Sequence, residues 1–185
     1  KDFCYANVSL LDAASQAKVW KLRKAGLGIL MSKRSKERAT AFLEDVSVPL
    51  DKLPEFLKYF KKHFTDAGKE IGFYGHAGVG CVHVRPMIDL SDDVDRKLMV
   101  DSMNEIAQLV KDMGGALSGE HGDGLTRSWL NEKMFGPKVY QLFKGLKKAF
   151  DPDNLMNPGK IVNAPGPLEN LKVDANTSRL KLNSQ

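Results

Sequence analysis

The sequence is poor in cysteine, and it lacks a long apolar run. Two cysteines among 185 residues, Cys4 and Cys81, argue against a disulfide framework. The N-terminus lacks the basic, apolar and small-residue pattern of a signal peptide. No apolar run approaches the roughly 20 residues needed to cross a bilayer. We therefore expect a reducing, cytoplasmic setting without a transmembrane segment, in which any membrane contact of a longer protein is peripheral.

Several motifs that identify common enzyme classes are also missing. There is no P-loop, no CxxC pair and no GxSxG, and no GxGxxG follows a strand and opens a helix. The net charge of +5 is dispersed, and the densest basic run, residues 33–38, contains an acid. A solvated loop explains that run better than a nucleic-acid surface. The chain therefore offers no nucleotide loop and no activated nucleophile, and nucleic acid is not an expected partner.

Length and composition indicate one globular domain. The 185 residues are 42% hydrophobic and 28% charged. From Asn163 the composition shifts to Pro, Gly, Asn and Ser without periodicity. We predict a domain over residues 1–163 and a linker or tail over residues 164–185. Because the chain begins at Lys1 without a methionine, we expect a fragment or a processed product.

Apolar periodicity predicts a mixed α+β fold. The order of elements, β-α-β-β-α-β, matches the split βαβ pattern, so we predict a ferredoxin-like antiparallel sheet with helices on one face and further C-terminal helices. Asp51 and Ser91 are the expected caps of the two long helices, and His63 is expected to be exposed. The predicted helices are residues 11–24, 51–64, 91–113, 128–134 and 136–151, and the predicted strands are residues 39–48, 70–76, 81–87 and 116–118. Several apolar residues are predicted to face inward, among them Val94, Val139, Leu142, Phe143 and Leu146.

Three of the four histidines lie in two glycine-rich stretches. The first, GHAGVGCVH at residues 75–83, holds His76 and His83. A straight strand would separate them by roughly 23 Å and a helix by about 10 Å. Two imidazoles on one metal ion each need a bond of about 2 Å, so the chain has to double back. Gly78 and Gly80 permit this reversal, and we predict a strand–turn–strand that presents both histidines.

The second stretch, residues 118–124, places Glu120 beside His121. His76, His83 and Glu120 form a common ligand set for Zn²⁺ that leaves one position open, and Mn²⁺ or Fe²⁺ also accept it. A histidine beside a cation stays neutral, so His121 can act as a general base. Such a site could bind a 2-hydroxy acid through its hydroxyl and carboxylate oxygens, with the metal acidifying the hydroxyl and His121 removing its proton.

Two arginines are candidate clamps for a substrate carboxylate, Arg23 and Arg85, since guanidinium pairs with carboxylate bidentately. Solvated surface charge explains Arg85 and Arg127 equally well. Trp20 shares a helix face with Arg23 and could border the same pocket, although core packing is the simpler role. An oxidant is missing, so the residues describe half an active site. A free-standing metal-binding module, a metal hydrolase and a purely structural domain remain alternatives.

Longer motifs carry a family resemblance. The blocks SGEHGDGL (residues 118–125), FGP (residues 135–137) and FDPDNLMNPGKI (residues 150–161) resemble the C-terminal domain of FAD-linked oxidases. That family includes D-lactate dehydrogenases, the glycolate oxidase FAD subunit and D-2-hydroxyglutarate dehydrogenases. FLEDVSVP (residues 42–49) is similar to the strand before the family's first long cap helix. CVHVRP (residues 81–86) and PGPLENL (residues 165–171) are most similar to large bacterial members, in which an iron–sulfur region follows the flavin portion.

The resemblance implies a cap domain over a flavin that is held mainly by an N-terminal domain absent here. It assigns metal, Zn or Mn, to His76, His83 and Glu120, and the role of base to His121. It further places Arg23 and Arg85 near the substrate carboxylates and Asn157 near the flavin ring. The implied function is that of the substrate domain of a FAD-dependent D-2-hydroxy acid dehydrogenase, inactive alone, with D-2-hydroxyglutarate favoured slightly over D-lactate and iron–sulfur clusters elsewhere in the full-length protein.

Three positions depart from the family pattern. Val79 and Cys81 stand where the family commonly has Asp and Asn. Leu43 stands where some hydroxyglutarate enzymes have a substrate-binding lysine. These departures leave the metal ligands in place and bear on which substrate is bound.

Overall fold

A computed structural model describes residues 8–32 and 35–171, and it divides into two compact units, residues 1–35 and 36–185. The first unit is built on helix α1 (Ala13–Met31), which begins where the Asp12 carboxylate accepts the Ser15 amide at 2.8 Å. The prediction that this helix ends before Gly26 is wrong, because i→i−4 hydrogen bonding does not need a side chain. Trp20 is 63% exposed, so it does not pack into a core in the described chain.

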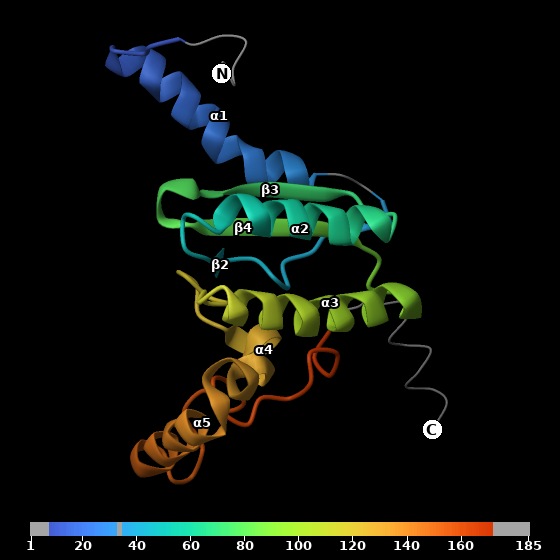
Figure 1. The fold of residues 1–185 in the computed structure, drawn as a ribbon, viewed down its shortest axis with the longest axis vertical. Coiled ribbons are helices and arrows are strands. Elements are labelled where there is room, and N and C mark those ends of the chain that lie inside the picture. Colours follow the sequence, from blue (N-terminus) through green and yellow to red (C-terminus); the bar gives the residue numbers. More distant parts are fainter. Residues whose placement is uncertain (1–7, 33–34, 172–185) are drawn as a thin grey trace. The chain divides into compact units, whose positions relative to one another are not determined.

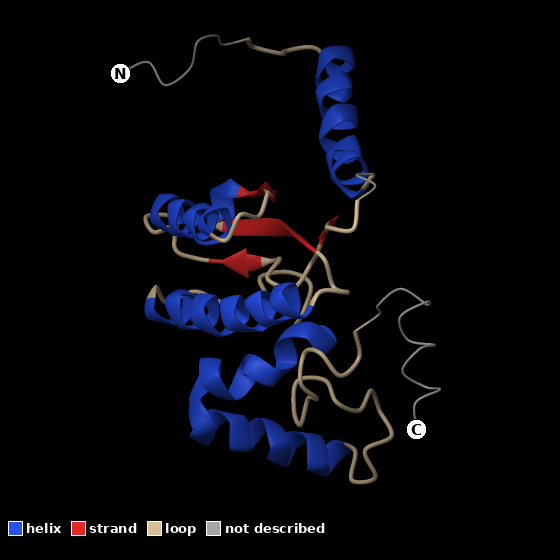
Figure 2. Cartoon of the chain, turned by 90° about the vertical axis from the view of Figure 1, so that its right-hand side faces the viewer, coloured by secondary structure: helices blue, strands red, loops and turns tan. Residues whose placement is uncertain are grey.

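The second unit is organised around strand β4 (Cys81–Ile88), which pairs with three other strands, all antiparallel. The long neighbour is β3 (Ile71–His76), and the short strands β1 (Arg38–Ala39) and β2 (Val46–Ser47) pair with opposite ends of β4. Figure 2 shows these strands in red among the helices of this unit. The predicted α+β class with an antiparallel sheet is confirmed.

The prediction of one strand over residues 39–48 is wrong. The chain forms two short strands instead, because it bends between them, with Asp45 in a left-handed conformation at φ 74°. The candidate strand at residues 116–118 amounts to a single bridge between Ser47 and Ala116. The bridge places the segment around Ser47 next to Ala116, 69 residues further along the chain.

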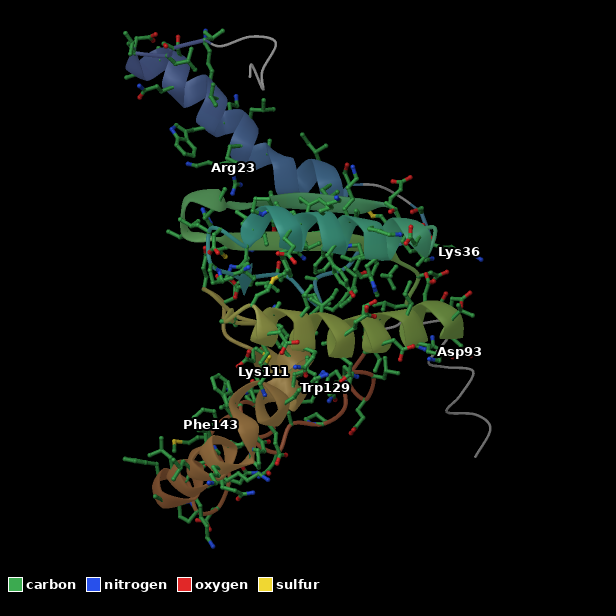
Figure 3. The ribbon with its side chains drawn as sticks, in the orientation of Figure 1. Arg23, Lys36, Asp93, Lys111, Trp129 and Phe143 are labelled. Atoms are coloured by element: carbon green, nitrogen blue, oxygen red, sulfur yellow. The ribbon has the colours of Figure 1, made fainter. Side chains whose placement is uncertain are left out.

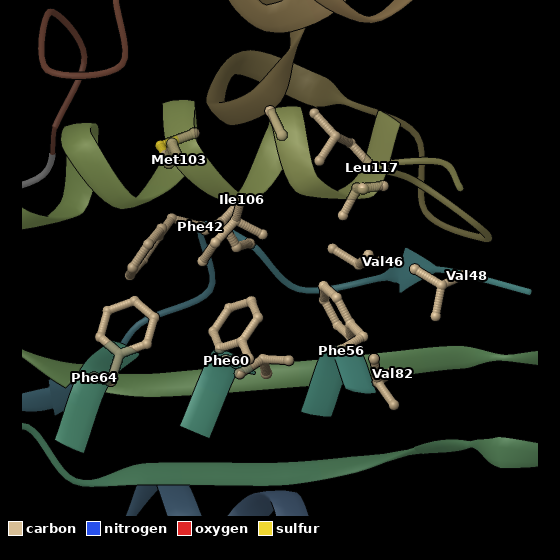
Figure 4. Packing of buried hydrophobic residues seen from close by; sticks show 14 of the residues in the cluster. Phe42, Val46, Val48, Phe56, Phe60, Phe64, Val82, Met103, Ile106 and Leu117 are labelled. Atoms are coloured by element: carbon tan, nitrogen blue, oxygen red, sulfur yellow. The ribbon is translucent and has the colours of Figure 1, made fainter. Parts of the chain in front are cut away.

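Two helices supply most of the core, α2 (Leu53–Asp66) and α3 (Asp93–Asp112). In α2, phenylalanines recur every fourth residue, so they lie on one face, and all three are buried. Figure 4 shows that face opposite side chains of α3 and of the segment around β2. The cluster includes the fully buried side chains of Phe42, Phe56, Phe60, Phe64, Met103 and Ile106.

Both predicted helix caps are corrected by the structure. Helix α2 begins after Lys52 without a side-chain cap, so Asp51 does not cap it. Helix α3 is capped by Asp92, whose carboxylate accepts the amides of Val94 and Asp95, and not by Ser91. Val94, in the first turn of α3, is 74% exposed, contrary to the prediction that it faces the core.

His63 is not exposed as predicted, since its side chain is only 16% accessible. Its Nε2 lies 2.8 Å from the Ser102 hydroxyl of α3, and its Nδ1 lies 3.7 Å from Glu105. The polar side of α2 therefore partly faces a neighbouring helix rather than solvent. That contact requires the tertiary fold, which is why helical periodicity alone misplaced the residue.

The C-terminal part begins with the short helix α4 (Gly124–Arg127) and a 3₁₀ turn η2 (Ser128–Leu130), followed by α5 (Asn131–Phe150). Gly136, at φ 79°, interrupts α5, which confirms two helical segments meeting at Gly136-Pro137. The predicted inward face of α5 is only partly covered by described residues: Phe143 is half-buried and packs edge-to-face on Phe135, whereas Leu142 is 70% exposed. Figure 1 shows α5 in brown at one end of this unit, and Figure 3 marks Phe143 on it.

The segment after α5 has no regular secondary structure between residues 151 and 171. Val162 is buried, and Leu171 packs against the core. The predicted domain boundary at residue 163 stays a prediction, and residues 172–185 of the predicted tail lie outside the described residues. No helix in the described part of the chain is both long and apolar enough to span a membrane.

Candidate active site

The first glycine-rich stretch forms the predicted strand–turn–strand. β3 and β4 are joined by a 3₁₀ turn, η1 (Ala77–Val79), and their register sets His76 opposite Cys81 and Tyr74 opposite His83. Gly80 makes the reversal at φ 71°, and a Cβ there would lie 2.0 Å from the Val48 carbonyl oxygen. Only glycine fits that position. Gly78, by contrast, has open space around it and no positive φ, so the reversal does not depend on it.

The turn brings the two histidine rings to a centroid distance of 5.5 Å. The second stretch approaches them from the loop after α3, where Glu120 Oε1 lies 3.2 Å from His76 Nε2. One ligand atom each from His76, His83 and Glu120 lies within 4.8 Å of the others. The three residues that the sequence grouped as metal ligands are thus brought together by three separate segments of backbone.

His121 lies against the same group. Its ring stacks on His83 at 5.2 Å between centroids and 11° between planes. Its Nδ1 is 3.4 Å from Glu44 Oε1, and its Nε2 is 3.7 Å from Glu120 Oε2. Carboxylates face both ring nitrogens, and the nearer one, Glu44 at Nδ1, favours the tautomer with the proton on Nδ1, which leaves Nε2 to accept a proton.

His83 is the buried member of the cluster, at 3% exposure. Burial lowers the pKa of His83, an effect that the nearby Glu120 carboxylate opposes. Its Nδ1 is buried and has no hydrogen-bond partner among the described residues. A neutral imidazole with an unsatisfied ring nitrogen, next to a second imidazole and a carboxylate, fits a divalent cation.

Sequence reasoning missed Asp45, which is fully buried at the centre of the site. Its carboxylate accepts the amides of Glu120 at 2.9 Å and His121 at 2.7 Å, and the Ser118 hydroxyl at 2.7 Å. Burial by itself would raise the pKa of Asp45, but these hydrogen bonds outweigh it and lower that pKa. The available signal was an acidic pair, Glu44-Asp45, inside an otherwise apolar run.

Cys81 lies beside Asp45, to which its thiol donates at 3.6 Å. Burial raises the pKa of Cys81 to about 11. A thiol with so high a pKa is protonated at neutral pH and is a poor nucleophile. Cys81 therefore does not supply an activated nucleophile.

The arginines fall into different settings. Arg85 forms an ion pair with Glu44 and donates to the Tyr74 hydroxyl at 3.2 Å, while its buried Nε lacks an acceptor among the described residues. Arg127 is buried and donates to the carbonyls of Glu44 and Gly122, both at 2.6 Å. Solvated surface charge is therefore the wrong description of Arg127, which holds two backbone segments together.

Two predicted site residues are not described as members of this group. Arg23 belongs to the first unit, whose placement relative to the site is not defined. Asn157 is exposed, at φ 46°, in the irregular segment after α5. The structure therefore collects His76, His83, Glu120, His121 and Arg85, and does not add these two to the group.

Comparison with known proteins identifies the family of this chain. Residues 2–161 match the family model described as FAD linked oxidases, C-terminal domain. The chain belongs to that family. It is 35% identical over 150 residues to a D-2-hydroxyglutarate dehydrogenase of Haemophilus influenzae and 37% identical over 168 residues to one of Pseudomonas putida. A protein of Danio rerio named probable D-lactate dehydrogenase, mitochondrial, is 33% identical over 162 residues.

The aligned regions cover 81%, 90% and 87% of this chain, but only 14%, 16% and 31% of the three relatives. The chain thus spans less than a third of the length of each of these relatives. The family match therefore covers one domain of such a protein.

Proposed function

We propose that this chain is the substrate- and metal-binding domain of a FAD-dependent D-2-hydroxy acid dehydrogenase, which oxidises the hydroxy acid to the 2-oxo acid. The observation that carries the proposal is the cluster of His76, His83, Glu120 and His121, within a member of the FAD-linked oxidase family. D-2-hydroxyglutarate is the first substrate to test and D-lactate the second, following the names of the relatives. A cytoplasmic location is part of the proposal.

The metal ligands in this proposal are His76, His83 and Glu120, which would hold Zn²⁺ or Mn²⁺. The unsatisfied ring nitrogen of His83 supports a cation there, because a buried polar atom without a partner is costly. When bound, a divalent cation supplies Lewis-acid chemistry that lowers the pKa of a substrate hydroxyl. The protein's own contribution is to hold the three donors close together before substrate arrives.

His121 is the proposed base. Glu44 occupies its Nδ1 side, so Nε2 takes the hydroxyl proton of the substrate. The hydrogen on Cα would leave as hydride, for which a bound flavin would supply the two-electron oxidant. Stacking on His83 restricts the His121 ring to one plane. Proton and hydride together account for the two hydrogens lost in forming the 2-oxo acid.

Arg85 is proposed to bind a substrate carboxylate. Its Nε still lacks an acceptor, and Glu44 already neutralises its charge. A substrate carboxylate would therefore either displace Glu44 from the Arg85 guanidinium or bind that guanidinium beside Glu44. Arg23 is proposed as a second carboxylate contact on the family resemblance alone.

The flavin would be bound mainly by a domain outside this chain, with Asn157 near its ring.

The apolar face of α5 supports a large partner surface at this end of the unit. Leu142, Leu146 and Phe150 are 70%, 61% and 76% exposed, and a groove of about 320 Å³ lies among Phe143, Leu146, Lys147, Phe150, Ile161 and Val162. Exposed apolar patches of this kind mark interaction sites. The proposed partner of this surface is the flavin domain of the same protein. An iron–sulfur region is a further proposed part of the full-length protein.

A substrate screen tests the proposal. The full-length protein is assayed with D-2-hydroxy acids and a dye as electron acceptor, and purified protein is analysed for metal. We expect dye reduction with D-2-hydroxyglutarate or D-lactate, and metal that is lost in a His76→Ala, His83→Ala double variant. The 185-residue chain alone should be inactive and should not retain FAD. Tight stoichiometric flavin binding by that chain, or hydrolase activity of its metal-loaded form without flavin, would overturn the proposal.

A further inference from the structure

We propose that Asp45 is the positioning residue that shapes the loop bearing Glu120 and His121. In relation to metal this inference rests on the proposed function, but its structural part can be tested on metal-free protein. Asp45 lies between β1 and β2, more than 70 residues before the loop, and yet its carboxylate binds that loop at three points. Neither Glu120 nor His121 is buried, so core packing does not hold their side chains in place.

The hydrogen bonds around Asp45 use both carboxylate oxygens. Oδ1 accepts the amide of Glu120 and the thiol of Cys81, and Oδ2 accepts the amide of His121 and the hydroxyl of Ser118. An ionised carboxylate only accepts, so it can satisfy four donors at once. Asparagine would present an NH₂ group to at least one pair of donors. The site therefore requires the acid and not merely a polar side chain of the same shape.

The backbone of Asp45 adds to the same attachment. Its carbonyl accepts the Gly119 amide at 2.8 Å, and its own amide donates to the Val82 carbonyl in β4 at 3.1 Å. Asp45 thus joins three consecutive amides of the loop, at residues 119–121, to the strand that carries His83. A Cβ at Gly119 would lie 2.1 Å from the Ser47 hydroxyl oxygen, so the loop is also close-packed there.

This attachment determines where the neighbouring side chains point. Fixing the Glu120 amide directs its carboxylate to His76, and fixing the His121 amide places its ring on His83. Arg127 provides a second link between the same two segments, through the carbonyls of Glu44 and Gly122. Without Asp45, both side chains would remain in the chain but would lose their common orientation. Groups that orient metal ligands typically change metal affinity by about 10–100-fold when they are removed.

The substitution Asp45→Asn tests the proposal with the least change to the backbone, because asparagine tolerates a positive φ. Asp151→Asn is the matched control. Asp151 is also buried and also accepts two amides, those of Leu155 and Met156, but it lies outside the histidine cluster. Two quantities are measured on the 185-residue chain: hydrogen exchange of individual amides without metal, and Mn²⁺ or Zn²⁺ affinity by calorimetry.

We expect Asp45→Asn to speed exchange of the Glu120 and His121 amides at least about tenfold and to weaken metal binding by about 10–100-fold. Asp151→Asn should leave both quantities at this site unchanged. If Asp45→Asn does not fold, Ser118→Ala removes a single donor to the same carboxylate, and a smaller change in the same direction is expected. In the wild type, slow exchange of the two amides despite their place in a loop is the expected result.

Several outcomes would overturn the inference. Fast exchange of both amides in the wild type would remove its basis, and so would unchanged exchange in Asp45→Asn. Weaker metal binding with unchanged exchange would make Asp45 a direct ligand instead. Faster exchange with unchanged metal affinity would deny it any influence on the site. If no variant and no wild-type protein binds metal, the proposed metal site fails, while the exchange data still decide whether Asp45 shapes the loop.

Discussion

Replacement of Gly80 by alanine should destabilise the β3–β4 hairpin, which carries His76 and His83. Gly80 has φ 71°, and its added Cβ would lie 2.0 Å from the Val48 carbonyl oxygen. The left-handed conformation costs a non-glycine residue roughly 1–2 kcal/mol, and relieving an overpacked contact costs typically about 1–3 kcal/mol. We therefore expect the free energy of unfolding to fall by about 2–5 kcal/mol. For a chain of this length, that corresponds to a Tm roughly 4–20 °C lower.

Gly78→Ala is the matched control, since the same residue type lies in the same turn with nothing within 4 Å of its added Cβ. It should change the free energy of unfolding by less than about 1 kcal/mol. Thermal unfolding followed by circular dichroism measures both variants, and calorimetric titration with Mn²⁺ or Zn²⁺ reports whether the histidines still converge. Equal Tm values for the two variants would refute the close approach of Gly80 to Val48.

Three further predictions concern pH, the core and α5. Because hydrogen bonding lowers the pKa of Asp45 in the folded state below its ordinary 3.8, Asp45 stabilises the fold above that pH and ceases to do so as pH falls through the lower folded value. In urea unfolding, the wild type should exceed Asp45→Asn in free energy of unfolding by more at pH 6 than at pH 3. An equal difference at the two pH values would contradict an ionised Asp45 carboxylate. Phe60→Ala should lower the free energy of unfolding by about 3–5 kcal/mol, and the partly exposed Phe73, substituted likewise, should cost distinctly less. Leu146→Ser should change the stability of this chain by less than about 0.5 kcal/mol but should reduce flavin retention in the full-length protein; unchanged retention would exclude α5 from the domain contact.

The alternative of a purely structural domain requires the histidines to be satisfied within the fold. His83 does not meet this requirement, because its buried Nδ1 has no partner in the described part of the chain. His63 does meet it, through the Ser102 hydroxyl of the neighbouring helix. The two residues show how the same side chain serves packing in one place and remains available for a ligand in another.

Local patterns in the sequence were sufficient for the hairpin and for most helices. The rings of His76 and His83 can meet only if the chain reverses between them, and the glycines there permit that reversal. The four-residue spacing of the phenylalanines in α2 identifies the buried face of that helix. These are effects of neighbouring residues along the chain, so they can be read without the fold. The same holds for the break at Gly136, where glycine and proline interrupt a helical pattern.

Tertiary structure alone decided the roles of residues whose partners are distant in sequence. Asp45 binds amides of residues 120 and 121, and Arg127 binds the carbonyl of Glu44. No periodicity connects such positions, because hydrogen bonds between separate loops depend on how the sheet brings them together. The prediction for the apolar face of α5 met a similar limit. Amphipathic spacing shows that a helix face needs a packing partner, but it does not show whether this part of the chain supplies that partner. The sequence by itself determined which residue types are available for a metal and a proton; the sheet, through β4 and the bend at Asp45, determined that they meet.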